Sequence, residues 1–188
     1  MRPGMLALIA MAVIACQGEA RAQADRPDPA LLRAQQAVER QRFADAIRAL
    51  LPLAERGHFG AQLSLAKLFE LPIPQRDLTR SLHWYARAAA HGSPDAMEAV
   101  GLAHYLGRGT PVDMAAAAEW FRQAGDRGSE AAPYILGTMY EKGEGVPLDL
   151  RLARAWYDRA ARLGDVAAAA RRDALDRQLD QEGLTAPP

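Results

Sequence analysis

Small and apolar residues recur at three- and four-residue spacing along most of the chain, which is the pattern of helices that bury one face. In the segment 150–163, for example, Ala153, Trp156, Ala160 and Ala161 fall on one such face. Aromatic residues make up only 6% of the chain and alanine is abundant, which favours packed helices over a sheet because alanine is the best helix former. The pattern therefore predicts an all-α protein.

The helical pattern repeats at a fixed spacing. Trp84, Trp120 and Trp156 are separated by 36 residues each, and another aromatic residue follows each of them. Such repetition indicates stacked helix pairs, because one pair cannot bury its apolar face alone. We predict helix pairs at 61–92, 96–128 and 132–164, a plainer pair at 30–57 and a polar capping helix at 165–179. The other classes in register are Ala88, Ala124 and Ala160; Gly92, Gly128 and Gly164; Ala96, Ala132 and Ala168; Asp77, Asp113 and Asp149.

Each repeat is predicted to turn through a loop between its two helices. In the last repeat, a first helix of about 130–142 precedes the loop GEGVPL. We expect Gly143 to close that helix, because a left-handed closing residue is cheap only for glycine. Gly145 is then expected in the turn, and Asp149 is expected to cap the second helix by accepting backbone N–H bonds. The loop GRGTPVD repeats this design, whereas LPIPQRD (71–77) lacks both glycines and one residue, so its shape should differ.

Glycines also recur in two other places of the repeat. Gly101 and Gly137 lie inside helices, where glycine costs about 1 kcal/mol relative to alanine, so we expect a neighbouring helix to approach too closely for a side chain. Gly92, Gly128 and Gly164 are predicted to end second helices, just before the next start signals. The tryptophans and the aromatic residues after them are predicted to be core, rather than a platform for bases or sugars.

Residues 132–164 closely resemble the Sel1-like repeat, a branch of the tetratricopeptide-repeat superfamily. Residues 96–128 match well, with His104 at the tyrosine position, and residues 61–92 match in part. The resemblance implies a right-handed α-solenoid of stacked antiparallel helix pairs. The matching positions of the last repeat are Ala132, Leu136, Gly137, Tyr140, Gly143, Gly145, Val146, Asp149, Ala153, Trp156, Tyr157, Ala160, Ala161 and Gly164.

The N-terminus carries an export signal. Arg2 precedes the apolar run 5–15, which is too short for a membrane anchor but suits a secretory signal. Cleavage before Gln23 would remove a signal peptide of residues 1–22, whereas a lipobox reading of 13–16 would remove 1–15 and acylate Cys16. Both readings place the protein in the periplasm or cell envelope, with membrane contact only through a lipid anchor. Residues 23–29 are expected to form a linker, and 181–188 a disordered tail.

Composition and motifs point away from catalysis, cofactors and metals. The formal net charge is zero, without a basic stripe, which argues against nucleic-acid binding. Cys16 is the single cysteine, so neither an internal disulfide nor a cysteine metal site can form. The G-x-G loops lack the third glycine of a dinucleotide motif and the lysine of a P-loop. We therefore predict a protein that is not an enzyme and has no cofactor.

The resemblance implies a binding surface and also raises alternatives. First helices of such arrays line a concave groove, which suits a protein or peptide partner. Cysteine-rich exported relatives have been associated with β-lactamase-like or peptidoglycan-related activity, but this chain lacks their disulfides. We expect an interaction module of the bacterial cell envelope; the alternatives are an envelope enzyme acting on peptidoglycan or β-lactams, and a structural lipoprotein. The expected groove positions are Leu63, Lys67, Glu70, Glu98, Leu102, Tyr105, Tyr134, Thr138 and Glu141.

Overall fold

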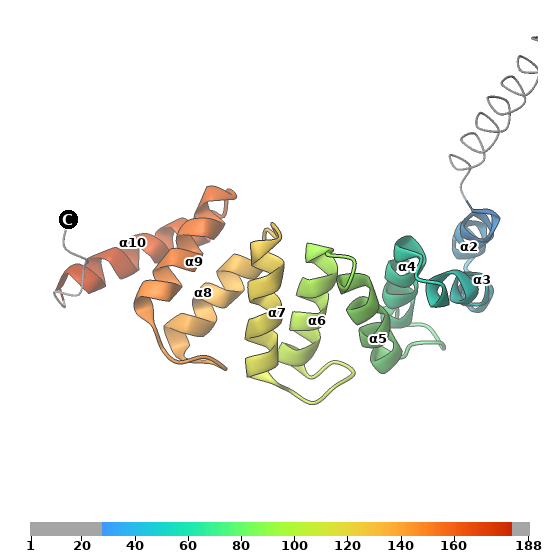
Figure 1. The fold of residues 1–188 in the computed structure, drawn as a ribbon, viewed down its shortest axis with the longest axis horizontal. Coiled ribbons are helices and arrows are strands. Elements are labelled where there is room, and N and C mark those ends of the chain that lie inside the picture. Colours follow the sequence, from blue (N-terminus) through green and yellow to red (C-terminus); the bar gives the residue numbers. More distant parts are fainter. Residues whose placement is uncertain (1–27, 182–188) are drawn as a thin grey trace, which may run out of the picture. The chain divides into compact units, whose positions relative to one another are not determined.

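A computed structural model describes residues 28–181, and within that range all regular structure is helical (Figure 1). The chain divides into two compact units, Met1–Leu50 and Leu51–Pro188. The predicted signal peptide, Cys16 and residues 182–188 lie outside the described residues. The described helices are α2 (Pro29–Glu39), α3 (Phe43–Glu55), α4 (Phe59–Glu70), α5 (Leu78–Ala89), α6 (Pro94–Leu106), α7 (Met114–Asp126), α8 (Ala132–Lys142), α9 (Leu150–Arg162) and α10 (Val166–Gln181).

The first unit contains α2 and the beginning of α3. Asp28 caps α2 by accepting a hydrogen bond from the Ala30 amide at 2.8 Å. The helix therefore begins inside the segment 23–29 that was predicted as a linker, because Asp28 and Pro29 are favourable helix-start residues. Ala34 and Ala37 of α2 are buried, as is Ala46 of α3.

The second unit contains three helix pairs, α4–α5, α6–α7 and α8–α9, followed by α10. Each helix packs against its neighbours in the chain, so the pairs follow one another in a row (Figure 1). The centre of each pair is the aromatic residue after the tryptophan: Phe121 and Tyr157 are fully buried and Tyr85 is nearly so. This arrangement confirms the predicted all-α repeat architecture.

Helix glycines admit these aromatic rings. A Cβ atom on Gly101 would lie 2.9 Å from the ring of Phe121, and one on Gly137 would lie 2.9 Å from the ring of Tyr157. Real Cβ atoms essentially never approach so closely. The predicted close approach is confirmed, and its cause is a ring from the second helix of the same repeat.

The two G-x-G loops follow the predicted design. Gly107 and Gly143 are left-handed closing residues with φ of 67° and 72°, and Gly145 lies in the turn with φ of 72°. Asp113 and Asp149 cap α7 and α9 through hydrogen bonds of 2.9 Å from the backbone. The predictions for Gly143, Gly145 and Asp149 are confirmed.

The second glycine of each loop also contacts the preceding repeat. A Cβ atom on Gly109 would lie 2.3 Å from the carbonyl oxygen of Leu78, and one on Gly145 would lie 2.3 Å from the backbone of Met114. Leu78 and Met114 are the first residues of α5 and α7. Each loop thus lies directly on the start of the previous second helix, which leaves no room for a side chain.

The shorter loop 71–77 keeps the same end points despite its different shape. It contains no residue with positive φ. Nevertheless, the Asp77 amide donates to the Phe69 carbonyl at 2.9 Å, as the Asp149 amide does to the Tyr140 carbonyl at 3.0 Å. Asp77 also caps α5 through the Arg80 amide at 3.0 Å. The loop is therefore shorter by one residue, but both of its ends keep the hydrogen bonds of the longer loops.

Three further sequence predictions need correction. Trp84 is buried, but Trp120 and Trp156 are only half-buried, whereas the residues after them, Phe121 and Tyr157, are fully buried. Trp156 instead lies against the preceding repeat, where a Cβ atom on Gly125 would be 3.1 Å from its ring. The helix predicted from residue 130 begins at Ala132, and α10 continues to Gln181, so that residue is helical rather than part of a disordered tail.

Helix α10 has the register of a first helix but carries charges where first helices are apolar. Arg172, Asp173 and Asp176 stand at the positions that Leu136, Gly137 and Tyr140 hold in α8. Asp176 pairs with Arg154 of α9 at 2.7 Å, and Arg172 pairs with Asp173 at 2.8 Å. Because Asp173 replaces the ring-admitting glycine, α10 lacks the surface that receives a following second helix, as expected of a capping helix.

Candidate functional site

The nine predicted groove residues lie on the first helices α4, α6 and α8 of the second unit. We call the surface formed by these residues the first-helix face. None of the nine is fully buried. Lys67 and Glu70 are exposed, and the other seven are half-buried: Leu63, Glu98, Leu102, Tyr105, Tyr134, Thr138 and Glu141.

A pocket opens on this face where α4, α5 and α6 meet, with a volume of about 240 Å³. It brings together two of the predicted groove residues, Glu70 and Leu102. Leu82 and Ala99 contribute to a mostly apolar wall, and Arg108 of the G-R-G loop also lines the cavity. We call this cavity the Glu70 pocket; its complete lining is Glu70, Leu78, Ser81, Leu82, Tyr85, Ala99, Leu102, Ala103 and Arg108.

Glu70 and Tyr85 form the polar side of the Glu70 pocket. The Tyr85 hydroxyl donates a hydrogen bond to one carboxylate oxygen of Glu70 at 3.0 Å. Burial of the hydroxyl and the neighbouring Glu70 charge raise the pKa of Tyr85 well above its ordinary value, so Tyr85 stays a neutral donor. Within residues 28–181, no side chain donates to the other carboxylate oxygen of Glu70.

Arg108 supplies a positive charge at the same pocket. Its side chain is exposed, and no acidic side chain between residues 28 and 181 forms an ion pair with it. Glu70 and Arg108 therefore line one cavity without neutralising each other. The pocket combines an apolar interior with one acceptor and one cation that are both available to a ligand.

The last repeat presents a different surface, because its polar groups satisfy one another. The Tyr157 hydroxyl donates to Glu141 at 2.6 Å and lies 3.0 Å from the Thr138 hydroxyl. Arg171 of α10 also donates to Glu141, at 3.3 Å. Tyr134 packs on Tyr157 with ring centroids 5.5 Å apart. Tyr134, Thr138 and Glu141 are thus brought together, but within an internal network.

The middle repeat is also internally paired. Ser129 donates a hydrogen bond to Glu98 at 2.6 Å. The Tyr105 ring contacts Phe121 edge-on at 6.3 Å, and its hydroxyl donates to Glu144 at 3.2 Å. Tyr105, an expected groove residue, is therefore already engaged by Phe121 and Glu144.

Sequence reasoning missed four residues that matter for the site or its support. Tyr85 was assigned to the core, and Arg108 was considered only as part of a loop. The register nevertheless places Arg108 and Glu144 at the same position between paired glycines. Arg87 and Arg159 each lie three residues after a tryptophan. That W-x-x-R spacing was a signal that could have been found.

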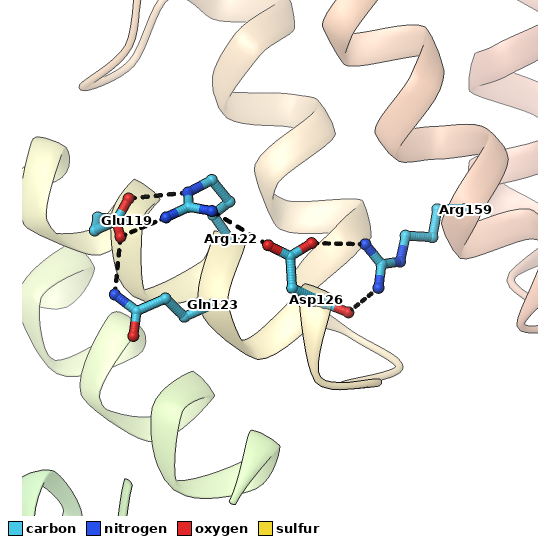
Figure 2. Close-up of polar contacts among 6 residues, drawn as sticks. Glu119, Arg122, Gln123, Asp126 and Arg159 are labelled. Atoms are coloured by element: carbon cyan, nitrogen blue, oxygen red, sulfur yellow. Dashed lines mark hydrogen bonds and ion pairs between the residues drawn. The ribbon is translucent and has the colours of Figure 1, made fainter. Parts of the chain in front are cut away.

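Arg159 joins α7 and α9, the second helices of neighbouring repeats. Its guanidinium pairs with Asp126 at 2.9 Å and donates to the Gly125 carbonyl near the end of α7 (Figure 2). It also stacks over Trp156 at 5.4 Å. Arg87 repeats this arrangement by stacking over Trp84 at 5.2 Å and donating to the Glu55 carbonyl at 3.2 Å. These arginines neutralise helix C-termini and hold repeats together.

The described residues contain neither a metal-binding cluster nor a helix suited to span a membrane. Among residues 28–181, no group of three histidine, cysteine or acidic side chains could hold a metal ion. In the same part of the chain, none of the helices combines the length and apolar character needed to cross a membrane.

Comparison with known proteins identifies the repeat. Residues 60–93, 94–129 and 131–165 match the Sel1 repeat, a family related to tetratricopeptide repeats. Together these segments cover more than half of the chain. Sel1 repeat proteins are generally protein-interaction modules. We found no match among curated proteins.

Solved structures share the architecture. A Sel1 repeat protein from Oxalobacter formigenes has a TM-score of 0.69 and 32% identity, over 82% of this chain and 46% of that one. A protective antigen of uropathogenic Escherichia coli strains with an SLR fold has a TM-score of 0.67 and 28% identity, over 81% of this chain and 34% of that one. Cysteine-rich protein B from Helicobacter pylori shares the fold, with a TM-score of 0.54, 21% identity, and coverage of 69% and 93%. The chain thus spans less than half of the first two proteins. On its repeats and its fold, the chain belongs to the Sel1 repeat family.

Proposed function

We propose that this protein is a non-enzymatic interaction module of the bacterial cell envelope that binds a segment of a partner protein along its first-helix face. The observation that carries the proposal is the Glu70 pocket, which opens on that face and places beside an apolar wall the Arg108 guanidinium, which has no ion-pair partner among residues 28–181. Interfaces of proteins combine apolar cores with polar groups in this way. The export signal at 5–15 supports the envelope location.

Site-specific photocrosslinking in cells tests the binding face. A photoreactive residue at Lys67, which is exposed on α4, should capture one partner protein. The same residue at Arg122, which lies on the exposed surface of α7, is the matched control and should capture little. Equal capture at both positions, or capture at Arg122 alone, would contradict binding along the first-helix face.

Alanine substitution of both Tyr105 and Tyr134 would not be a clean test of the first-helix face. Both rings pack on buried aromatic residues, so their removal would weaken the fold together with any binding. Crosslinking at Lys67 avoids this problem because its side chain is exposed.

Mass spectrometry of the mature N-terminus tests the location. Processing before Gln23 would give a soluble protein, and an acylated Cys16 would give a lipid-anchored one. A chain that keeps Met1 and fractionates with the cytoplasm would remove the envelope from the proposal.

A further inference from the structure

Two equivalent joints connect neighbouring repeats: the first lies between α4–α5 and α6–α7, and the second lies between α6–α7 and α8–α9. Because the loop 71–77 is one residue shorter, Glu70 corresponds to Tyr105 in the next repeat. Tyr85 corresponds to Phe121, and Arg108 corresponds to Glu144. The two joints therefore place the same backbone framework around different side chains.

The second joint is filled by the chain's own Tyr105. Its ring packs on Phe121 at 6.3 Å, and its hydroxyl donates to Glu144 of the loop at 3.2 Å. One side chain thus supplies an aromatic ring for the apolar wall and a polar group for the loop residue. At the first joint the shorter Glu70 is turned to Tyr85, and the Glu70 pocket remains open.

We infer that the Glu70 pocket binds an aromatic side chain of a partner polypeptide that is flanked by an acidic residue, in the place that Tyr105 fills at the second joint. This inference rests on the proposed function. The cavity of about 240 Å³ is lined by Leu78, Leu82 and Leu102, which suits a ring. At the second joint the loop residue Glu144 accepts a hydrogen bond from the Tyr105 phenol. At the first joint the loop residue is the cation Arg108, so the matching group of the ligand is a carboxylate.

Glu70 has a separate role in the same complex. Tyr85 occupies one of its carboxylate oxygens, and the second oxygen accepts a backbone N–H of the bound segment. The ligand is therefore an internal segment of a chain. The pocket recognises its aromatic ring, Arg108 its neighbouring acid, and Glu70 one of its backbone amides.

Two variants separate these features. Arg108→Glu changes an exposed side chain and reverses the charge at the pocket. Glu70→Tyr combined with Arg108→Glu rebuilds the Tyr105–Glu144 pair at the first joint and fills the cavity. A matched change at the second joint, Glu144→Arg, leaves the Glu70 pocket untouched.

The test uses acetylated and amidated twelve-residue peptides with a central Phe-Asp, Phe-Lys or Ala-Asp, measured by fluorescence anisotropy. The full chain should bind the Phe-Asp peptide about tenfold more tightly than the Ala-Asp peptide, which lacks the ring that fills the apolar cavity. It should also bind Phe-Asp more tightly than Phe-Lys, whose cation would face the Arg108 cation. Arg108→Glu should reverse the preference toward Phe-Lys, and the double variant should bind none of them. Glu144→Arg should bind as the wild type does.

Three results would overturn the inference: equal binding of the three peptides, an unchanged preference in Arg108→Glu, or retained binding by the double variant. Crosslinking at Lys67 separates failure of the pocket assignment from failure of the proposed function. If it still captures a partner, only the assignment of the pocket is wrong. If it captures nothing, the proposed function fails as well.

Discussion

The hydroxyl of Tyr157 donates a 2.6 Å hydrogen bond to the carboxylate of Glu141, and Tyr85 repeats this bond with Glu70 at the first repeat. Where the second helix carries Phe121 instead, the first helix carries Tyr105. Each repeat thus pairs a buried aromatic ring of its second helix with a matching side chain of its first helix. Where the second helix carries a tyrosine, a glutamate of the first helix accepts its hydroxyl bond. Where the second helix carries Phe121, the ring of Tyr105 packs on it.

These tyrosines should make stability fall at alkaline pH. Burial and the bond to Glu141 raise the pKa of Tyr157 above the value of about 10 that it has in an unfolded chain. The stabilisation is complete below pH 10 and is lost as the pH rises further, because only the unfolded chain then releases the proton. We expect the free energy of unfolding to fall by about 1.4 kcal/mol per pH unit for each such tyrosine.

Urea unfolding at several pH values between 8 and 11 measures this effect. Tyr157→Phe is the control, because its loss of stability relative to the wild type should shrink above pH 10. A constant difference across that range would show that Tyr157 ionises alike in both states.

Replacing Gly137 by alanine should destabilise the protein. Alanine favours a helix by about 1 kcal/mol, but its Cβ atom would lie 2.9 Å from the Tyr157 ring and force overpacking of about 1–3 kcal/mol. Chemical denaturation should therefore show a net loss. Gly60→Ala is the control: its Cβ would meet nothing closer than 3.4 Å, so stability should stay the same or rise. Equal effects at both glycines would contradict the packing argument.

Gly145→Ala should cost more than Gly164→Ala, although both glycines have positive φ, of 72° and 99°. Left-handed strain alone costs an alanine roughly 1–2 kcal/mol. At Gly164 nothing lies within 4 Å of the added Cβ, whereas at Gly145 the loop must also move away from Met114. Thermal unfolding of the two variants should rank them in that order, and the reverse order would show that the loop contact is unimportant.

Arg159→Gln should lower stability by about 1–2 kcal/mol, because it removes hydrogen bonds of a charged group to Asp126 and to the end of α7. Gln123 holds the equivalent position in the middle repeat, so glutamine fits there. The control is Arg122→Gln: its pairs with Glu119 and Asp126 are exposed contacts within one helix, worth less than about 1 kcal/mol (Figure 2). Comparable losses in both variants would rule out a special role for Arg159.

The repeat was readable from the sequence because its constraints are local. A left-handed closing residue at Gly143 and a helix cap at Asp149 depend only on nearby backbone, so residue type reveals them. The same local logic identified Gly101 as a packing position. It did not reveal that Phe121 is the ring concerned, since that contact depends on how two helices cross.

The candidate site was only partly predictable for the same reason. Register placed Glu70 and Leu102 on the first-helix face, and the structure brings both into one pocket. Register alone could not show that Tyr105 bonds to Glu144 or that Tyr134 packs on Tyr157, because those contacts join different helices. Arg108 was overlooked because its loop was considered only as a turn that connects two helices.

The G-x-G loops assign different tasks to three consecutive residues. In the loop 107–109, the first glycine ends a helix and the second lies on Leu78, so neither can change without strain. Arg108 between them is exposed and makes no ion pair within residues 28–181. The residue between the two glycines therefore differs between the two loops while the glycines keep their positive φ: it is a cation at 108 and an anion at 144. In the proposed binding mode, a single substitution at this position would change the charge offered to the ligand and leave both glycines in place.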